Sequence, residues 1–156
     1  MQRLQFWRFD NDGIRALLSV DAHLTRSGLE SSLIDLVFLR VSQLNRCSYC
    51  VDAHVHDAIE HGLDRRLVNA IATWRETPSF SKRQRAALAW TETVTEIATT
   101  QAPDEAYGEA AAEFSDSELV DLTLAIALMN AFARIAVAFR HGPPSVPALI
   151  DSPVVR

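Results

Sequence analysis

The stretch LVDLTLAIALMNAFARIAVAFR, residues 119–140, decides the fold class of this chain. Residues 115–118, Ser-Asp-Ser-Glu, form a capping box directly before it and predict a helix start. Apolar side chains surround most of the circumference of this predicted helix, and such a helix has to be buried on most sides. Asp121, Asn130 and Arg134 interrupt it, whereas a membrane span needs ~20 mostly apolar residues with few or no charges. We therefore predict a long buried helix and not a membrane span.

How this helix is buried indicates whether the chain assembles with other copies of itself. A chain of 156 residues has few other helices with which to surround it. A subunit interface would supply the missing cover, and homo-oligomers are common among soluble proteins. We therefore expect a homo-oligomer; the alternative is a central helix wrapped by its own neighbours.

The rest of the chain also has helical periodicity. Only 5 glycines and 6 prolines occur, and no alternating stretch is flanked by hairpin signals. No internal repeat or linker divides the chain, so we predict a single all-α domain over residues 1–156 with an extended, proline-rich tail at residues 143–156. Before residue 115 the predicted helices run from Ile14 to Gly28, from a cap at Ser31 or Ser32 to Leu44, from a cap at Ser48 to His61 with Gly62 following, from a cap at Asp64 to Trp74, from Ser81 to Ile97, and from Pro103 at a first helical position to Phe114.

Composition and charge exclude several classes of protein. Hydrophobic residues make up 48% of the chain, which is typical of a folded globular protein and argues against disorder. The net charge is -5 and no block of lysines and arginines occurs, so we expect no nucleic-acid partner. Residues 1–10 have no unbroken apolar stretch and no small-residue cleavage site, unlike a signal peptide. These patterns predict a cytoplasmic protein with no membrane partner, in a compartment that keeps ordinary thiols reduced.

The only two cysteines stand in the segment Cys47-Ser48-Tyr49-Cys50-Val51-Asp52-Ala53-His54. At a helix start, cysteines with two residues between them can close a disulfide within one turn. With Ser48 as the expected N-cap, Cys47 lies just outside the helix and Cys50 in its first turn, where the helix dipole favours the thiolate. His54 lies one turn past Cys50 and shares its face. This arrangement predicts thiol–disulfide or peroxide chemistry.

A thiol peroxidase needs the groups that this segment provides. A thiolate attacks the O–O bond, a proton carrier protonates the leaving oxygen, and a second thiol resolves the sulfenic acid. His54 can accept a proton from Cys50 and return it to the leaving group. Two antiparallel helices would not by themselves place Asp35, on the preceding helix, level with Cys50. The carboxylates that could orient the histidine are Asp35, Asp52, Asp57 and Glu60.

Other interpretations of the cysteine pair stay open. Cys47, Cys50, His54 and one further ligand could bind zinc, although one continuous helix cannot easily wrap a tetrahedron. The pair could instead serve a thiol–disulfide oxidoreductase or a redox sensor, or consist of inert core cysteines. Among the remaining side chains we expect solvated histidines at His56 and His61, and packing residues at Tyr49 and Trp74.

The segment LVFLRVSQLNRCSYCVDAH, residues 36–54, resembles the core motif of the alkylhydroperoxidase AhpD-like proteins, which belong to the carboxymuconolactone decarboxylase superfamily. Residues 72–78, 80–95 and 119–140 are similar to the continuation of that family, so the resemblance covers a core of about residues 10–142. It implies an AhpD-like, all-α bundle of about six to eight helices. It also implies an oligomer, either a trimer or a hexamer.

The resemblance further implies antioxidant peroxidase activity that needs no metal or other cofactor. Cys50 would be the peroxidatic thiol, Cys47 the resolving and more exposed sulfur, and His54 part of the proton relay. The acidic residue of the relay falls on Asp35, which is one methylene shorter than the family's glutamate, so a water would have to bridge it. Tyr49 stands where AhpD has a histidine, which implies a simpler relay and a slower peroxidase.

We therefore expect a peroxiredoxin-type oxidoreductase that reduces hydrogen peroxide or small organic hydroperoxides. Its reductant would be a thiol, carried by a lipoyl-bearing or thioredoxin-like protein. The sequence itself specifies no peroxide-binding pocket.

Overall fold

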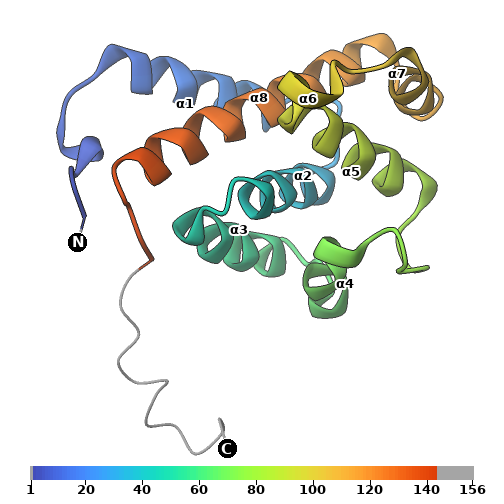
Figure 1. Cartoon of the computed structure of the whole chain (residues 1–156), viewed down its shortest axis with the longest axis horizontal. Coiled ribbons are helices and arrows are strands. Elements are labelled where there is room, and N and C mark those ends of the chain that lie inside the picture. The colour runs from blue at the N-terminus through green and yellow to red at the C-terminus, as the bar shows by residue number, and fades with distance from the viewer. Residues whose placement is uncertain (1, 144–156) are drawn as a thin grey trace, which may run out of the picture.

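The computed structural model describes residues 2–143, and every regular element in that range is helical (Figure 1). This confirms the all-α prediction and the expected number of helices. The predicted extended tail, apart from Pro143, lies outside the described residues. The elements are η1 (Phe6–Arg8), α1 (Asp12–Leu24), α2 (Ser31–Leu44), α3 (Ser48–Glu60), α4 (Arg65–Ala70), η2 (Ile71–Thr73), α5 (Lys82–Thr95), α6 (Ile97–Thr100), α7 (Asp104–Ala111) and α8 (Asp116–Ala138).

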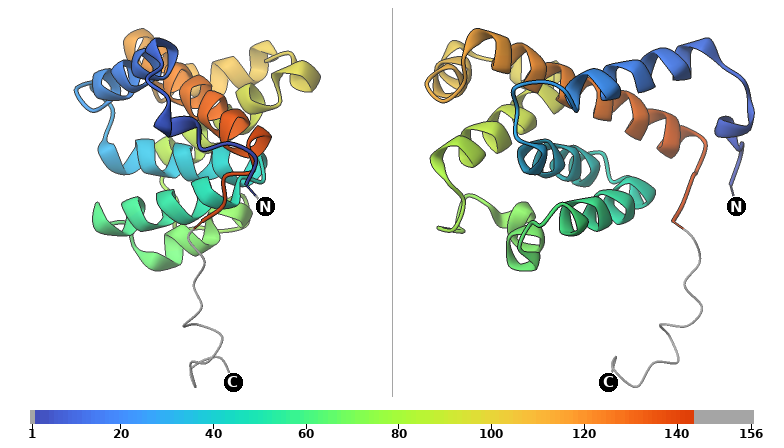
Figure 2. Two further views of the ribbon diagram at one scale, coloured as in Figure 1. Left: turned by 90° about the vertical axis from the view of Figure 1, so that its left-hand side faces the viewer. Right: turned by 180° about the vertical axis from the view of Figure 1, so that it is seen from behind.

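Helix α2 lies at the centre of the fold and packs against α3, α5 and α8. The views in Figures 1 and 2 agree that α1 and α8 run side by side along one edge of the molecule, with α3 and α4 along the opposite edge. Two faces of α2 therefore serve two hydrophobic cores. The core toward α8 takes Leu33, Val37, Phe38 and Val41, and the core toward α3 and α4 takes Leu36 and Leu39.

Helix α8 is the long apolar helix that the sequence predicts. Among residues 2–143 it alone has the length and composition to cross a membrane, but it packs against α1, α2 and α5 as a core helix. Only 44% of its most apolar window is buried, as expected for a helix that this chain cannot cover by itself, and the alternative of a central helix wrapped by its own neighbours is not met. Val120, Leu124 and Val137 are 60%, 40% and 47% exposed, so parts of its apolar surface stay uncovered by the described residues.

Three predicted helix starts are confirmed. Ser115 forms a capping box with Glu118 at the start of α8, and Ser81 forms a second box with Gln84 at the start of α5. The side chain of Asp64 caps α4 by accepting a hydrogen bond from the backbone N–H of Arg66. These side chains satisfy backbone donors that have no partner inside their helix.

Other predicted boundaries are wrong by a residue or more. Helix α2 begins at Ser31, so Glu30 is its N-cap and neither Ser31 nor Ser32 caps it. Pro103 is the N-cap of α7 and not its first helical residue. The helix predicted to reach Trp74 divides into α4 and η2. Each of these differences lies at a helix end. Local hydrogen bonds set the boundary there, and the sequence pattern determines it least.

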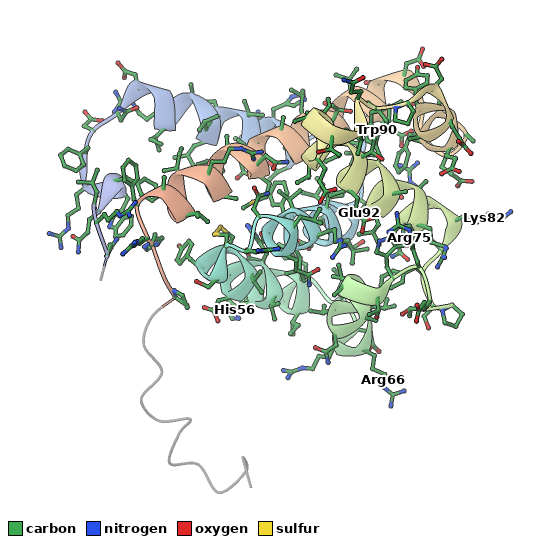
Figure 3. All side chains as sticks on the ribbon, viewed as in Figure 1. His56, Arg66, Arg75, Lys82, Trp90 and Glu92 are labelled. Carbon is green, nitrogen blue, oxygen red and sulfur yellow. A yellow bond between two sulfur atoms is a disulfide. The ribbon has the colours of Figure 1, made fainter. Side chains whose placement is uncertain are left out.

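An ion cluster ties α2 to α5. Glu92 Oε1 accepts hydrogen bonds from Arg40 Nη2 at 2.6 Å and from the indole N–H of Trp74 at 2.8 Å, and Arg75 pairs with the other oxygen (Figure 3). Burial alone raises the pKa of Glu92, but these hydrogen bonds outweigh it and hold the pKa below its usual value. Trp74 is buried, which confirms it as a packing residue. The cluster therefore holds α2, the helix that leads into Cys47, against α5.

Candidate active site

Cys47 and Cys50 form a disulfide at the N-terminus of α3, with an S–S distance of 2.10 Å (yellow bond in Figure 3). Closure of the pair within one turn is thereby confirmed. The prediction of Ser48 as N-cap is wrong, because α3 begins at Ser48 and Cys47 is the N-cap. The sulfur of Cys47 accepts the hydrogen bond from the backbone N–H of Cys50 at 3.3 Å and so takes the place of a capping hydroxyl. In the reduced protein this position favours a thiolate.

Both cysteines are buried, at 1% residue exposure for Cys47 and 3% for Cys50. These two values do not separate the sulfurs, so the expectation that Cys47 is the more exposed one stays a prediction. The turn that leads into the pair passes through Arg46 in a left-handed conformation with φ of 55°. Cys50 borders a large cavity, whereas Cys47 borders a shallow hollow together with Val51 and Asp52. The disulfide thus separates two approaches to the site.

His54 lies one turn past Cys50 on α3, as predicted, and lines the same cavity. Its Nδ1 is 3.2 Å from a carboxylate oxygen of Asp57, and its ring lies against Phe38 at 5.3 Å between centroids. Burial lowers the pKa of His54. The imidazole is therefore neutral at pH 7 and able to accept a proton.

Asp35 lies level with His61, at the far end of α3 from Cys50. The antiparallel course of α2 and α3 produces this pairing, in which His61 Nδ1 and Asp35 Oδ2 are 2.9 Å apart. Burial raises the pKa of Asp35, and the hydrogen bond to Asp35 raises the pKa of His61. His61 is solvated, as expected, with its side chain 54% exposed, but the sequence did not predict its pairing with a buried carboxylate. His56 is exposed, as expected, and lies 3.4 Å from Glu60 (Figure 3).

The cavity beside Cys50 has a volume of about 720 Å³ and is mostly apolar. A second hollow of about 530 Å³ holds Asp35 and His61 and shares Asp21, Phe38, His54 and Asp57 with the first. The two spaces therefore adjoin around His54. Its imidazole borders both the cavity of Cys50 and the hollow that holds Asp35 and His61. The cavity beside Cys50 is lined by Phe6, Trp7, Ile14, Leu18, Asp21, Phe38, Tyr49, Cys50, Ala53, His54, Asp57, Met129, Phe132, Ala136 and His141.

Three aromatic rings from distant parts of the chain form one wall of this cavity. The ring of His141, which follows α8, lies against Trp7 of η1 at 4.1 Å and against Tyr49 of α3 at 3.9 Å between centroids, tilted by 48° and 44°. Burial lowers the pKa of His141. Tyr49 packs as predicted but is 37% exposed. No spacing in the sequence signals this wall, because its members lie more than 40 residues apart.

The geometry gives the zinc interpretation no support. Within the described range, residues 2–143, no group of three or more histidines, cysteines and carboxylates is arranged to hold a metal ion. His54 and Asp57 line the cavity of Cys50, but Cys47 faces the opposite hollow. What the site brings together is a dithiol pair, a neutral imidazole and an apolar cavity.

The sequence pattern of the carboxymuconolactone decarboxylase family matches residues 12–93, which is more than half of the chain and includes the cysteine pair. The chain belongs to this family. The resemblance to its AhpD-like members is confirmed by a solved structure from Agrobacterium tumefaciens, ATU0492, described as a protein of unknown function and a candidate antioxidant defence protein AhpD. That structure is 38% identical, has a TM-score of 0.89, and aligns over 94% of this chain and 100% of its own.

Two further similar proteins extend the comparison. The uncharacterised protein YdfG of Bacillus subtilis is 28% identical over 137 residues, which cover 88% of this chain and 93% of YdfG. The debrominase Bmp8 is 19% identical, with a TM-score of 0.72 over 83% of this chain and 70% of Bmp8. The second likeness shows a shared fold alone, and it shows that the fold houses more than one named activity.

Proposed function

We propose that this chain is a thiol-dependent peroxidase of the AhpD-like kind, which reduces hydrogen peroxide or small organic hydroperoxides at Cys50. The observation that carries the proposal is the placement of Cys50: one sulfur of a closed redox pair borders a cavity that also contains the neutral imidazole of His54. A cysteine at a helix N-terminus is activated as a thiolate. A peroxide that enters the cavity meets the nucleophile and the proton carrier together.

The chemical steps use these residues in order. His54 takes the proton of the Cys50 thiol, and the thiolate attacks the distal oxygen of ROOH. The O–O bond breaks, Cys50 becomes a sulfenic acid, and His54 returns the proton to the leaving oxygen, which departs as ROH. The Cys47 thiol then attacks the Cys50 sulfur, so that a disulfide forms and water leaves. Asp57 orients His54 during the first two steps. The negative charge of Asp35 acts on His54 electrostatically.

The catalytic cycle closes when an external dithiol reduces the disulfide by thiol exchange. We propose a lipoyl-bearing or thioredoxin-like protein as the reductant and a cytoplasmic location, where such dithiols are kept reduced. The hollow at Cys47 lies apart from the peroxide cavity and offers the approach for this thiol. The same hollow supports the second candidate function, a thiol–disulfide oxidoreductase that exchanges electrons with a protein and reacts with peroxide only slowly.

We also propose that the protein is a homo-oligomer, a trimer or hexamer, assembled through the uncovered side of α8. Val120 and Leu124 are exposed there. With Trp90 and Tyr107 they line an apolar groove of about 460 Å³. A second subunit would remove this surface from water.

Stopped-flow oxidation of the fully reduced protein by hydrogen peroxide and by cumene hydroperoxide tests the peroxidase. Both thiols are counted before and after, in the wild type and in the matched variants Cys50→Ser and Cys47→Ser. We expect rapid loss of both thiols in the wild type and no reaction in Cys50→Ser. Cys47→Ser should complete one turnover and stop at a sulfenic acid that dimedone traps.

Other results would reassign the function. Thiol loss no faster than that of a free thiol of the same pKa, together with rapid exchange with a protein dithiol, would favour the oxidoreductase. Full peroxide turnover by Cys50→Ser would reverse the roles of the two cysteines.

A further inference from the structure

The cavity beside Cys50 is far larger than hydrogen peroxide requires. Its volume is about 720 Å³, whereas a water molecule, with half the heavy atoms of hydrogen peroxide, occupies about 30 Å³ of liquid. Sites for small organic ligands fall in the range of roughly 300–1,000 Å³ and are mostly apolar with a few polar groups. The cavity has this size and composition, so its dimensions point to an organic ligand.

Partly exposed aromatic side chains line the cavity. Trp7 is 47% exposed and Tyr49 is 37% exposed, although both rings lie against His141. Leu18 of α1, which lines the same cavity, is 53% exposed. A flat aromatic ligand between these side chains would remove apolar area on both sides from water and would stack favourably on the rings. The wall is therefore suited to an arene.

The reacting groups line the same cavity, where Cys50 and His54 lie on one face of α3. Phe38 packs on the ring of His54, and Phe132 of α8 lines the same space. A molecule with an apolar body and one polar end would thus be held with its polar end at the sulfur. This is the orientation that a hydroperoxide needs for attack on its distal oxygen.

The charged side chains that line the cavity are all acidic. Asp21 of α1 and Asp57 of α3 contribute carboxylates, and no lysine or arginine is among the described residues that line it. The two histidines are neutral at pH 7, since burial lowers the pKa of both His54 and His141. An anionic ligand would be repelled by these carboxylates and would have no positive side chain with which to pair. An uncharged ligand would not be repelled.

We propose that this cavity is a binding site for the uncharged, arene-bearing body of an organic hydroperoxide, with Trp7, Tyr49 and His141 as the wall that selects it. The inference rests on the proposed peroxidase function and names its substrate class. The arene leaves as the corresponding alcohol when Cys50 takes the distal oxygen. Asp21 adds discrimination against substrates that carry a carboxylate.

Three hydroperoxides with the same reacting group test the proposal. The rate of disulfide formation at pH 7 is measured with cumene hydroperoxide, its 4-carboxylate analogue and tert-butyl hydroperoxide. We expect the cumene compound to react about tenfold faster than the tert-butyl compound and about fivefold faster than the carboxylate. Asp21→Asn should reduce the preference over the carboxylate. Trp7→Ala should bring the cumene and tert-butyl rates together, and Leu18→Asn takes its place if Trp7→Ala does not fold. The control is Ile97→Ala, which removes an exposed apolar side chain on α6. This control should leave every rate ratio unchanged.

A binding measurement separates this inference from the peroxidase proposal. Ligand-observed NMR follows 2-phenyl-2-propanol, the product alcohol, with Cys50→Ser, and we expect binding that Trp7→Ala weakens. Binding without rapid peroxide reduction would overturn the proposed function and leave the arene site standing. Rapid reduction with equal rates for all three hydroperoxides would overturn the arene site and leave the peroxidase standing. Absence of binding together with a smaller sedimenting species for Trp7→Ala would also overturn it, because a second copy of the chain would then occupy this wall.

Discussion

The ion pair between Asp35 and His61 allows a quantitative test of how the two helices of the site are joined. The perturbation is a double-mutant cycle of Asp35→Asn, His61→Gln and the two combined. The Asp35 side chain is 9% exposed, the His61 side chain is 54% exposed, and their atoms are 2.9 Å apart. A hydrogen bond to a charged group contributes ~1.5–3 kcal/mol, and an exposed ion pair ~0–1 kcal/mol. With one partner buried and the other half-exposed, we expect a coupling free energy of about 1 kcal/mol.

The sign of the pH dependence follows from the pKa of His61. The bond to Asp35 raises that pKa above its unfolded value. The stabilisation is therefore fully present below the usual histidine pKa of ~6.5, while Asp35 is ionised, and is lost as the pH rises through the raised pKa. Burial raises the pKa of Asp35 as well, but the cost of ionising Asp35 enters both sides of the cycle and cancels. The coupling should thus be near its maximum at pH 6 and close to zero at pH 9.

Urea unfolding of the disulfide-bonded protein, followed by circular dichroism at one fixed protein concentration, measures the coupling. The control cycle replaces His61→Gln with His56→Gln, since His56 is exposed and lies beside Glu60 instead. A coupling below about 0.3 kcal/mol at pH 6 would lie within the additivity error of distant sites and would refute the pairing. A coupling that persists unchanged to pH 9 would show that the contact is not a charge pair.

Three further changes have defined outcomes. His54→Gln should slow oxidation of Cys50 at pH 7 about a hundredfold, since a positioned proton carrier contributes that much or more; an unchanged stopped-flow rate would remove His54 from the relay. Asn130→Ala should lower the free energy of unfolding by about 1–3 kcal/mol, because the buried amide bonds the side chain of Asn45 at 2.8 Å, and a urea midpoint equal to that of the wild type would contradict this. Leu124→Asp should convert the oligomer to a smaller species in sedimentation velocity, and a wild type that sediments as a monomer would exclude the proposed interface.

Local signals explain which parts of the fold could be predicted. The boxes at Ser81 and Ser115 lie within four residues of the groups they cap, so the sequence alone specifies them. The cap of α3 could not be predicted in the same way. Ser48 is the better capping residue by type, but the disulfide holds Cys47 at the position where its sulfur accepts the bond.

Tertiary packing decides the parts of the site that could not be predicted. The spacing of Cys50 and His54 on one helix is a local property and was sufficient to bring both to one cavity. The sequence also indicated that Asp35 would not lie level with Cys50, but the partner it meets instead, His61, depends on the length of both helices. The wall formed by Trp7 and His141 depends on how η1 and the residues after α8 meet Tyr49 at the start of α3, and neither residue belongs to a motif.

The meeting of the two ends of the described range, residues 2–143, has a consequence for biosynthesis. The backbone N–H of Arg3 donates to the carbonyl of Phe139 at 2.9 Å, and the ring of His141 completes the cavity wall. Translation releases Cys47 and Cys50 almost a hundred residues before these last contacts can form, and N-terminal parts of a chain fold first during synthesis. On the ribosome both thiols are thus present before the cavity is enclosed, so a nascent chain is open to any oxidant. The proposed selectivity for a substrate would therefore arise only after α8 and His141 have been released.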